Sequence, residues 1–134
     1  MILAVETSCD DSAAAVLSAE GAVLAQRVFT QPAQSGGVVP EIASRLHMKI
    51  LPEMTAGVLA ESGCTLGDIT HFAATAGPGL VGSLLVGLSF AKALAFSSER
   101  PFLGINHLAA HLHIHYERDT EDLFPAVALL ASGG

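Results

Sequence analysis

The sequence has little positive charge. Its 134 residues contain six lysines and arginines against thirteen aspartates and glutamates, a formal net charge of -7. The basic residues form no cluster along the chain. A protein that binds nucleic acid depends on such clusters, because contacts between cationic side chains and the phosphate backbone dominate the affinity. The chain is therefore not expected to hold a nucleic acid unaided, and any such role needs basic surface from elsewhere.

Cysteine is also scarce. Cys9 and Cys64 lie far apart and form no CxxC pair. This spacing indicates neither a disulfide framework nor a cysteine-based zinc site. The start of the chain lacks the basic segment that precedes the apolar run of a signal peptide. We therefore expect a cytoplasmic protein.

Long apolar runs are limited to one, residues 78–96. This run is apolar apart from Gly, Ser and Lys92, and its length approaches that of a membrane span. Because Lys92 lies well inside the run, we expect a buried or interface helix and no membrane association. The composition, with 51% hydrophobic and 14% charged residues and a mean hydropathy of +0.52, suggests an apolar surface reserved for a partner.

The N-terminal part predicts a β-meander. Apolar runs at residues 2–5, 13–17 and 22–29 alternate with polar turns. The first turn carries the adjacent carboxylates Asp10 and Asp11 among hydroxyl side chains. Such a turn can cradle phosphate, with the paired carboxylates holding a bridging cation. An ordinary polar hairpin tip has the same composition, so these residues leave both interpretations open.

A helix is expected over residues 40–62, because Pro40 suits a first helical turn. Pro52 is expected to kink or divide this helix. Arg45 and His47 are expected to face solvent rather than to take part in catalysis. The residues expected on the buried face are Ile42, Leu46, Ile50, Met54 and Val58.

The rest of the chain alternates strands and helices. Strands are expected at residues 71–75 and 102–105, and a glycine-rich turn at residues 76–79 leads into the apolar helix. Such a turn can receive an anion at the helix N-terminus, or its glycines can allow close helix packing. A final buried strand is expected at residues 126–130. The order of elements predicts one α/β domain in which helices flank a mixed sheet, without internal repeats or a linker.

Histidines are concentrated in one predicted helix. His107, His111 and His115 recur every four residues, which puts them on one helical face. Two imidazoles at this spacing can bind one metal ion, although a half-exposed helix rich in histidine is the plain alternative. A protease of the HEXXH type needs a general-base glutamate directly after the first histidine, where this sequence has Leu108. A metalloendopeptidase is therefore disfavoured.

Five motifs carry a resemblance to a known family: ETSCDDS, GGVVPEIASRLH, TAGPGLVGSLLVG, NHLAAH and LLASGG. In this order and spacing, the chain resembles the N-terminal half of the TsaD family. These proteins are tRNA N6-adenosine threonylcarbamoyltransferases, formerly labelled O-sialoglycoprotein endopeptidases or glycoproteases. The resemblance implies the ASKHA fold (acetate and sugar kinases, Hsp70, actin), which is ribonuclease H-like. Residues 1–134 would form the N-terminal lobe of a two-lobed protein whose second lobe is absent from the sequence.

The resemblance implies transfer of a threonylcarbamoyl group from threonylcarbamoyl-adenylate to N6 of adenosine 37 in tRNAs that read ANN codons. It implies one divalent metal ion, iron or zinc, whose histidine ligands match His107 and His111. The third ligand would be an aspartate of the second lobe, and an adenylate or ATP-type nucleotide would lie between the lobes. Asp10 and Asp11 match an acidic turn important for activity. The substrate-binding stretch matches Leu130, Ala131, Ser132, Gly133 and Gly134.

Partners follow from the same resemblance. It implies a TsaB-type paralogue, a TsaE-type ATPase, and tRNA bound by the whole complex rather than by this lobe. The helices over residues 40–62 and 78–96 are the expected contact surface for that partner or for a homodimer. A non-catalytic heterodimerisation lobe of the TsaB type is the alternative function, and the histidine pair argues against it. The pair also argues against a kinase lobe of the same superfamily.

The sequence departs from the family pattern in two places besides the absent second lobe. The histidine motif usually contains an acidic residue, whereas Ala109 and Ala110 stand between the two histidines here. Metal binding is expected to survive this change, but any role of that carboxylate is lost. The loop at residues 31–35 is shorter than in the family and lacks its usual His and Tyr.

Overall fold

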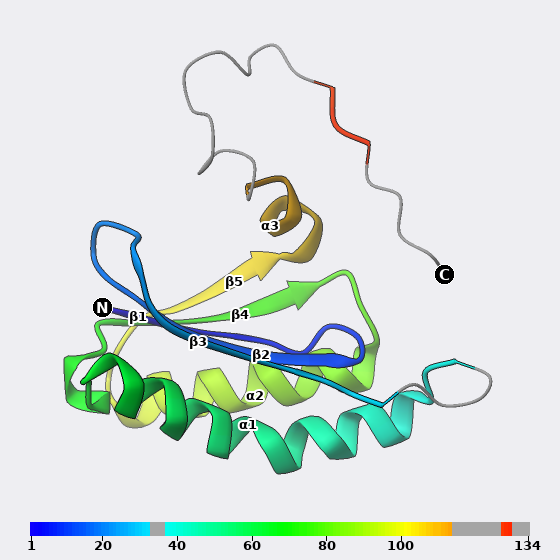
Figure 1. The fold of residues 1–134 in the computed structure, drawn as a ribbon, viewed down its shortest axis with the longest axis horizontal. Helices are drawn as coiled ribbons and strands as arrows, with labels where there is room; N and C mark the ends of the chain where they lie inside the picture. Colours follow the sequence, from blue (N-terminus) through cyan, green and yellow to red (C-terminus); the bar gives the residue numbers. More distant parts are fainter. Residues whose placement is uncertain (33–36, 114–126, 130–134) are drawn as a thin grey trace.

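The structure, a computed structural model, describes residues 1–32, 37–113 and 127–129. Its sheet consists of β1 (Ile2–Glu6), β2 (Asp11–Leu17), β3 (Val23–Thr30), β4 (His71–Gly77) and β5 (Phe102–Asn106). The strands lie in the order β3-β2-β1-β4-β5 (Figure 1). The first three strands are antiparallel neighbours, whereas β4 runs parallel to β1 and β5 runs parallel to β4. The predicted meander and mixed sheet are confirmed.

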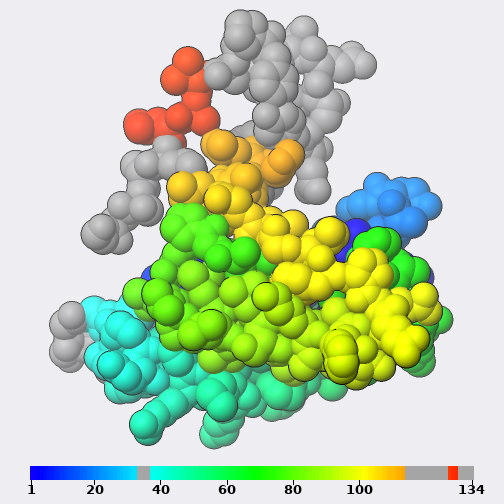
Figure 2. All heavy atoms as spheres, turned by 180° about the vertical axis from the view of Figure 1, so that it is seen from behind, coloured from blue at the N-terminus to red at the C-terminus, as the bar shows by residue number. Residues whose placement is uncertain are grey.

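Helices lie on both sides of this sheet: α1 (Pro40–Ser62), α2 (Val81–Ser97) and α3 (His107–His113), with a short 3-10 helix at Leu66–Asp68. The helices α1 and α2 cover one face, and α3 stands on the other side where β5 ends (Figure 1). From behind, α2 and β5 form a continuous surface above which α3 projects (Figure 2). Because β1, β4 and β5 are parallel, their C-terminal ends meet at one edge of the sheet.

The core lies between the sheet and the two long helices. Since successive side chains of a strand point to opposite faces, every second residue of β1 and β2 faces α1 and α2. These inward residues are almost fully buried, and they pack with side chains of β4 and both helices. The cluster includes Leu3, Val5, Ala14, Val16, Phe72, Leu51, Val58, Ala91 and Ala95.

The helix α1 has the predicted bounds and part of the predicted buried face, since Met54 and Val58 are buried and Ile50 packs against the core. Ile42 is 40% exposed, and His47, expected in solvent, is fully buried. The prediction was wrong at these two positions because α1 packs against β2, β3 and α2 at once, and small or polar side chains fit this crowded space. The residues that α1 buries are Ala43, His47, Leu51, Met54, Thr55 and Val58.

Pro52 lies inside α1 without dividing it. A proline removes one backbone hydrogen bond, to the carbonyl four residues before it. Pro52 and Met48 are both exposed, so water can satisfy the carbonyl of Met48 in place of the missing donor. Of the two predicted effects of Pro52, a kink or a division, the division is not observed.

The apolar helix predicted over residues 78–96 is confirmed as α2, which begins a few residues later, at Val81. Within the described part of the chain, no helix combines the length and apolarity that crossing a membrane demands. The residues that α2 buries are mostly small: Ser83, Leu84, Gly87, Ala91 and Ala95. Small side chains let α2 approach the sheet closely.

The strand predicted at residues 126–130 is not formed in its described part. Residues 127–129 have no regular secondary structure, and the side chains of Val127 and Leu129 are exposed. An apolar run becomes a strand only when its backbone groups pair with a neighbouring strand. Figure 1 shows residues 127–129 apart from the sheet, which explains why the prediction failed.

Candidate functional site

The turn between β1 and β2 is fastened to α2. The buried Thr7 hydroxyl donates a hydrogen bond to the Ser83 carbonyl at 2.8 Å and accepts one from the Gly87 N–H at 3.1 Å. Ser83 and Gly87 are one helical turn apart, so this hydroxyl lies directly against the helix backbone. A Cβ at Gly87 would collide with Thr7 Oγ1. The glycine at this position is therefore what permits the close approach.

Ser8 continues the contact at the start of α2. Its carbonyl accepts a hydrogen bond from the Leu80 N–H at 2.8 Å. A Cβ at Gly79 would collide with the same carbonyl. Of the two roles that the sequence allows for the glycine turn, the structure thus shows close packing.

His47 reaches the same turn from α1. Its Nδ1 lies 2.7 Å from Ser12 Oγ, and its Nε2 lies 3.0 Å from the Cys9 carbonyl oxygen. A carbonyl only accepts, so Nε2 carries the proton and donates it, and Nδ1 accepts from the Ser12 hydroxyl. The sequence analysis missed this residue. The available signal was that His47 lies four residues from both Ala43 and Leu51, which places all three on one face.

Asp10 is half-buried and Asp11 is exposed. Among the described residues, neither carboxylate forms an ion pair. Partial burial, and secondarily the neighbouring Asp10, raise the pKa of the Cys9 thiol. The backbone of this turn is held from two helices, an arrangement that both a binding turn and an ordinary hairpin tip can have.

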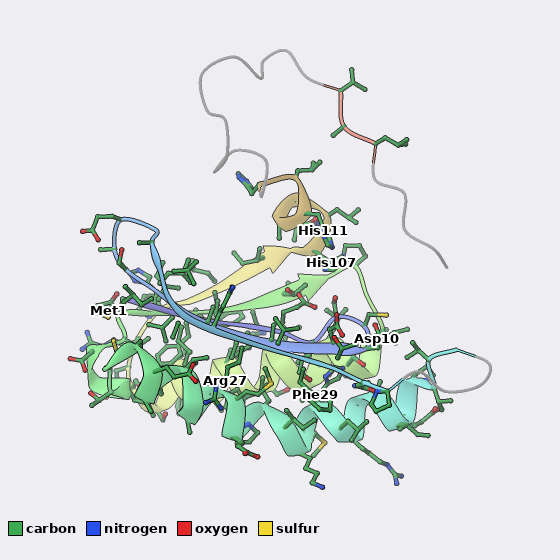
Figure 3. The ribbon with its side chains drawn as sticks, viewed as in Figure 1. Met1, Asp10, Arg27, Phe29, His107 and His111 are labelled. Atoms are coloured by element: carbon green, nitrogen blue, oxygen red, sulfur yellow. The ribbon has the colours of Figure 1, made fainter. Side chains whose placement is uncertain are left out.

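The histidine pair starts where β5 ends. Asn106 Oδ1 accepts a hydrogen bond from the Ala109 N–H at 3.0 Å, which caps the first turn of α3. The Nε2 atoms of His107 and His111 lie 3.1 Å apart, and their rings are perpendicular with centroids 4.5 Å apart. Figure 3 shows both rings on the α3 side of the sheet, towards the end at which Asp10 lies. The predicted shared face is confirmed for this pair, and His115 lies outside the described residues.

The separation of the two Nε2 atoms fits a shared metal ion. Two nitrogens bound to Zn²⁺ at about 2.0–2.1 Å in tetrahedral geometry lie roughly 3.3–3.4 Å apart. The observed 3.1 Å is within a few tenths of an ångström of that value. Over residues 1–32, 37–113 and 127–129, no group of three His, Cys, Asp or Glu side chains could hold a metal. The described part of the site therefore offers two ligands.

The other nitrogen of His107 faces β1. Nδ1 lies 3.2 Å from Ser8 Oγ and 3.8 Å from Glu6 Oε2. The Glu6 carboxylate also accepts hydrogen bonds from the Ser8 N–H and the Thr75 hydroxyl. Ser8 thus joins the acidic turn to the histidine pair. The sequence analysis did not single out Glu6, although an acid directly after an apolar strand was a visible signal.

These groups border an open depression of about 480 Å³ on the sheet face opposite α1 and α2. Alanines of β1, β2 and β4 form much of its lining. Its polar end is lined by Glu6, Thr75, His107 and His111. Ala110, between the two histidines, also lines the depression. The predicted substrate stretch Leu130, Ala131, Ser132, Gly133 and Gly134 lies outside the described residues.

Comparison with known proteins identifies related sequences along the whole chain. The family model TsaD, described as tRNA N6-adenosine threonylcarbamoyltransferase, matches residues 22–134. A relative of that name from Gluconobacter oxydans is 49% identical and is aligned over 99% of this chain and 38% of its own length. Another from Symbiobacterium thermophilum is 46% identical, over 100% of this chain and 40% of its own length. The chain thus spans about two fifths of the length of these relatives.

Solved structures share the fold. YeaZ from Pseudomonas aeruginosa superposes with a TM-score of 0.70 at 25% identity, covering 88% of this chain and 48% of that one. A structure described as an uncharacterized protein with similarity to peptidase YEAZ from Pseudomonas aeruginosa gives a TM-score of 0.71 at 27% identity, with the same coverage. These neighbours have the ASKHA-type fold, so the expected fold class is confirmed.

Proposed function

Because the chain belongs to the TsaD family, we propose that it forms the N-terminal lobe of a tRNA N6-adenosine threonylcarbamoyltransferase. The reaction moves the threonylcarbamoyl group of threonylcarbamoyl-adenylate to N6 of adenosine 37 in tRNAs that read ANN codons. The convergence of His107 and His111, with Nε2 atoms 3.1 Å apart, carries this proposal. The complete activity belongs to a protein that also contains the part by which the relatives exceed this chain.

In this proposal, His107 and His111 hold one divalent cation, Fe²⁺ or Zn²⁺, and an aspartate of the second lobe is the third ligand. A cation held by these two residues would supply Lewis-acid chemistry, polarising an oxygen of the carbamate or carboxylate of the transferred group. The two imidazoles bind through Nε2, which is the nitrogen that each presents to the other. Ala109 and Ala110 supply no carboxylate, so no proton transfer is assigned to this helix.

The acidic turn is the proposed nucleotide side of the site. Asp10 and Asp11 would hold a cation that bridges the phosphate of an adenylate or ATP-type nucleotide. The turn needs little reorganisation on binding, because α1 and α2 already hold its backbone. Residues 130–134 would hold the anionic adenylate through backbone N–H groups, which glycines leave sterically open.

The tRNA is assigned to the complex rather than to this lobe, whose net charge is -7. A TsaB-type paralogue and a TsaE-type ATPase are the proposed partners, and the cytoplasm is the proposed location. The resemblance to YeaZ structures supports a paralogue with the same lobe. The exposed side chains of Met48 and Leu85 lie in a groove between α1 and α2. This groove is the proposed contact for the paralogue, and a homodimer of the chain through it is the alternative.

A non-catalytic heterodimerisation lobe is the second candidate function, and the TM-scores of 0.70 and 0.71 to YeaZ-type structures are compatible with it. The two functions differ in what they require of His107 and His111. A scaffold has no need of convergent imidazoles, whereas the transferase loses its metal ligands without them.

The test is a chimera in which this chain replaces the matching part of the Gluconobacter oxydans relative. We expect it to form N6-threonylcarbamoyladenosine in a tRNA transcript when supplied with threonylcarbamoyl-adenylate and that organism's partner proteins. His107→Ala/His111→Ala should lower the rate at least about 100-fold, the upper range for disturbed metal sites. His71→Ala, an exposed histidine at the opposite end of β4, should leave it unchanged. If the folded chimera keeps its rate when both histidines are replaced, the transferase assignment is refuted and the scaffold is favoured.

A further inference from the structure

We propose that Glu6 is the positioning residue of His107. Its carboxylate keeps the ring proton on Nδ1, so that the lone pair of Nε2 points at the site shared with His111. The inference rests on the proposed function in one respect, namely that this pair is the metal site. The effect of Glu6 on the His107 ring needs no metal and is measurable without one.

The carboxylate of Glu6 is itself held rigidly. Oε1 accepts a hydrogen bond from the Ser8 N–H, and Oε2 accepts one from the Thr75 hydroxyl. Glu6 ends β1, and Thr75 lies on β4, the parallel neighbour of β1. Because both donors sit at the edge of the same sheet, the carboxylate cannot turn away without giving up a hydrogen bond.

The held carboxylate faces the inner nitrogen of His107. Glu6 Oε2 lies 3.8 Å from Nδ1, and Ser8 Oγ lies 3.2 Å from the same atom. The side chains of His107 and Glu6 are 30% and 31% exposed, so solvent only partly screens the pair. Within the described chain, Glu6 is the one carboxylate in ion-pair range of either histidine of the pair. Asp10 and Asp11, although close in sequence, have no such contact.

A neutral imidazole carries its proton on one nitrogen, and the neighbours of that nitrogen decide which. Negative charge beside Nδ1 favours the proton there, where it is donated to Ser8 Oγ. Nε2 of His107 then has a free lone pair, and the proton in the 3.1 Å contact between the Nε2 atoms belongs to His111. With a metal ion bound, His111 would carry its ring proton on Nδ1 instead, so that both Nε2 lone pairs could face the ion, and His107 would keep its tautomer. A carboxylate that accepts the ring N–H of a ligating histidine fixes its tautomer, and Glu6, at 3.8 Å from Nδ1, favours the same tautomer through its charge.

The experiment compares Glu6→Gln with Thr75→Val and Glu20→Gln in the 134-residue chain without metal. Glu6→Gln removes the charge, Thr75→Val removes one hydroxyl that holds the carboxylate, and Glu20→Gln removes a charge at the opposite end of the sheet. Long-range ¹H–¹⁵N spectra of the imidazoles report the His107 tautomer directly, at a pH where the rings are neutral. Backbone amide spectra of the same samples show whether each variant is folded.

We expect the Nδ1–H form in the wild type and in Glu20→Gln, a population shifted toward Nε2–H in Glu6→Gln, and a smaller shift in Thr75→Val. Zn²⁺ titrations should show about 10–100-fold weaker binding in Glu6→Gln, with His107→Ala/His111→Ala as the baseline. The inference is overturned if the wild type holds the Nε2–H form or if a folded Glu6→Gln keeps the wild-type tautomer. If the tautomer shifts but the wild type binds no more Zn²⁺ than the baseline, the orienting role stands and the metal-dependent function fails.

Discussion

Replacing His47 with phenylalanine is expected to destabilise the chain, because an aromatic ring remains but both hydrogen bonds of the imidazole are lost. The imidazole is fully buried and makes two hydrogen bonds, to Ser12 Oγ and to the Cys9 carbonyl. Phenylalanine leaves the buried Ser12 hydroxyl without its acceptor, which costs about 1–3 kcal/mol. The Cys9 carbonyl belongs to an exposed residue, so losing that bond costs about 0.5–1.5 kcal/mol. Together these give about 1.5–4.5 kcal/mol.

A double-mutant cycle separates the hydrogen bond from the packing. Ser12→Ala alone leaves His47 Nδ1 without a donor, a loss of about 1–3 kcal/mol. In Ser12→Ala/His47→Phe both hydrogen-bonding groups are gone, so neither is left buried without a partner. The double variant should therefore be less destabilised than the sum of the single variants, by about 1–2 kcal/mol.

Urea unfolding of the 134-residue chain, followed by circular dichroism, measures these free energies. The slope with denaturant must stay constant across the variants for the comparison to hold. His71→Phe, at an exposed position, is the control and should stay within about 0.5 kcal/mol of wild type. Equal stability of His47→Phe and wild type would refute the reasoning. So would single-variant effects that add within about 0.5 kcal/mol.

Two further predictions concern the same turn. Gly87→Ala should lower the free energy of unfolding by about 1–3 kcal/mol, because the new Cβ collides with the Thr7 hydroxyl. Urea unfolding measures this change, and unchanged stability would contradict the close approach of Thr7 to α2. Asp10→Asn should lower the pKa of the Cys9 thiol, because the carboxylate raises it, but not to the ordinary value, because burial is the larger cause. The rate of Cys9 alkylation as a function of pH, in a Cys64→Ser background, measures this pKa. An inflection at the same pH in Asp10→Asn as in the protein with Asp10 would contradict the prediction.

The sequence was sufficient for features that depend on local periodicity. Alternating apolar runs separated by polar turns predicted the meander, since side-chain alternation and turn chemistry are properties of short segments. The shared face of His107 and His111 followed from their spacing of four, and the structure brings their Nε2 atoms to 3.1 Å. Such features need no knowledge of what packs against them.

The sequence was insufficient where burial depends on distant partners. His47 was expected in solvent because a histidine is usually exposed, but Ser12 and Cys9, 35 and 38 residues away, satisfy both of its nitrogens. Glu6 was overlooked because Thr75, which holds its carboxylate, is 69 residues away. Only the parallel pairing of β1 with β4 brings these two residues together.

The acidic turn and the histidine pair are structurally coupled, because Ser8 belongs to the turn and contacts the pair. Its carbonyl is bound by the start of α2, its N–H is bound by Glu6, and its hydroxyl contacts His107. A shift of the acidic turn would therefore move the hydroxyl that meets the His107 ring, and a rotated ring would disturb the turn in return. The turn is also held from α1 through His47. Substitutions at His47 should consequently alter both nucleotide and metal binding, although the residue touches neither proposed ligand.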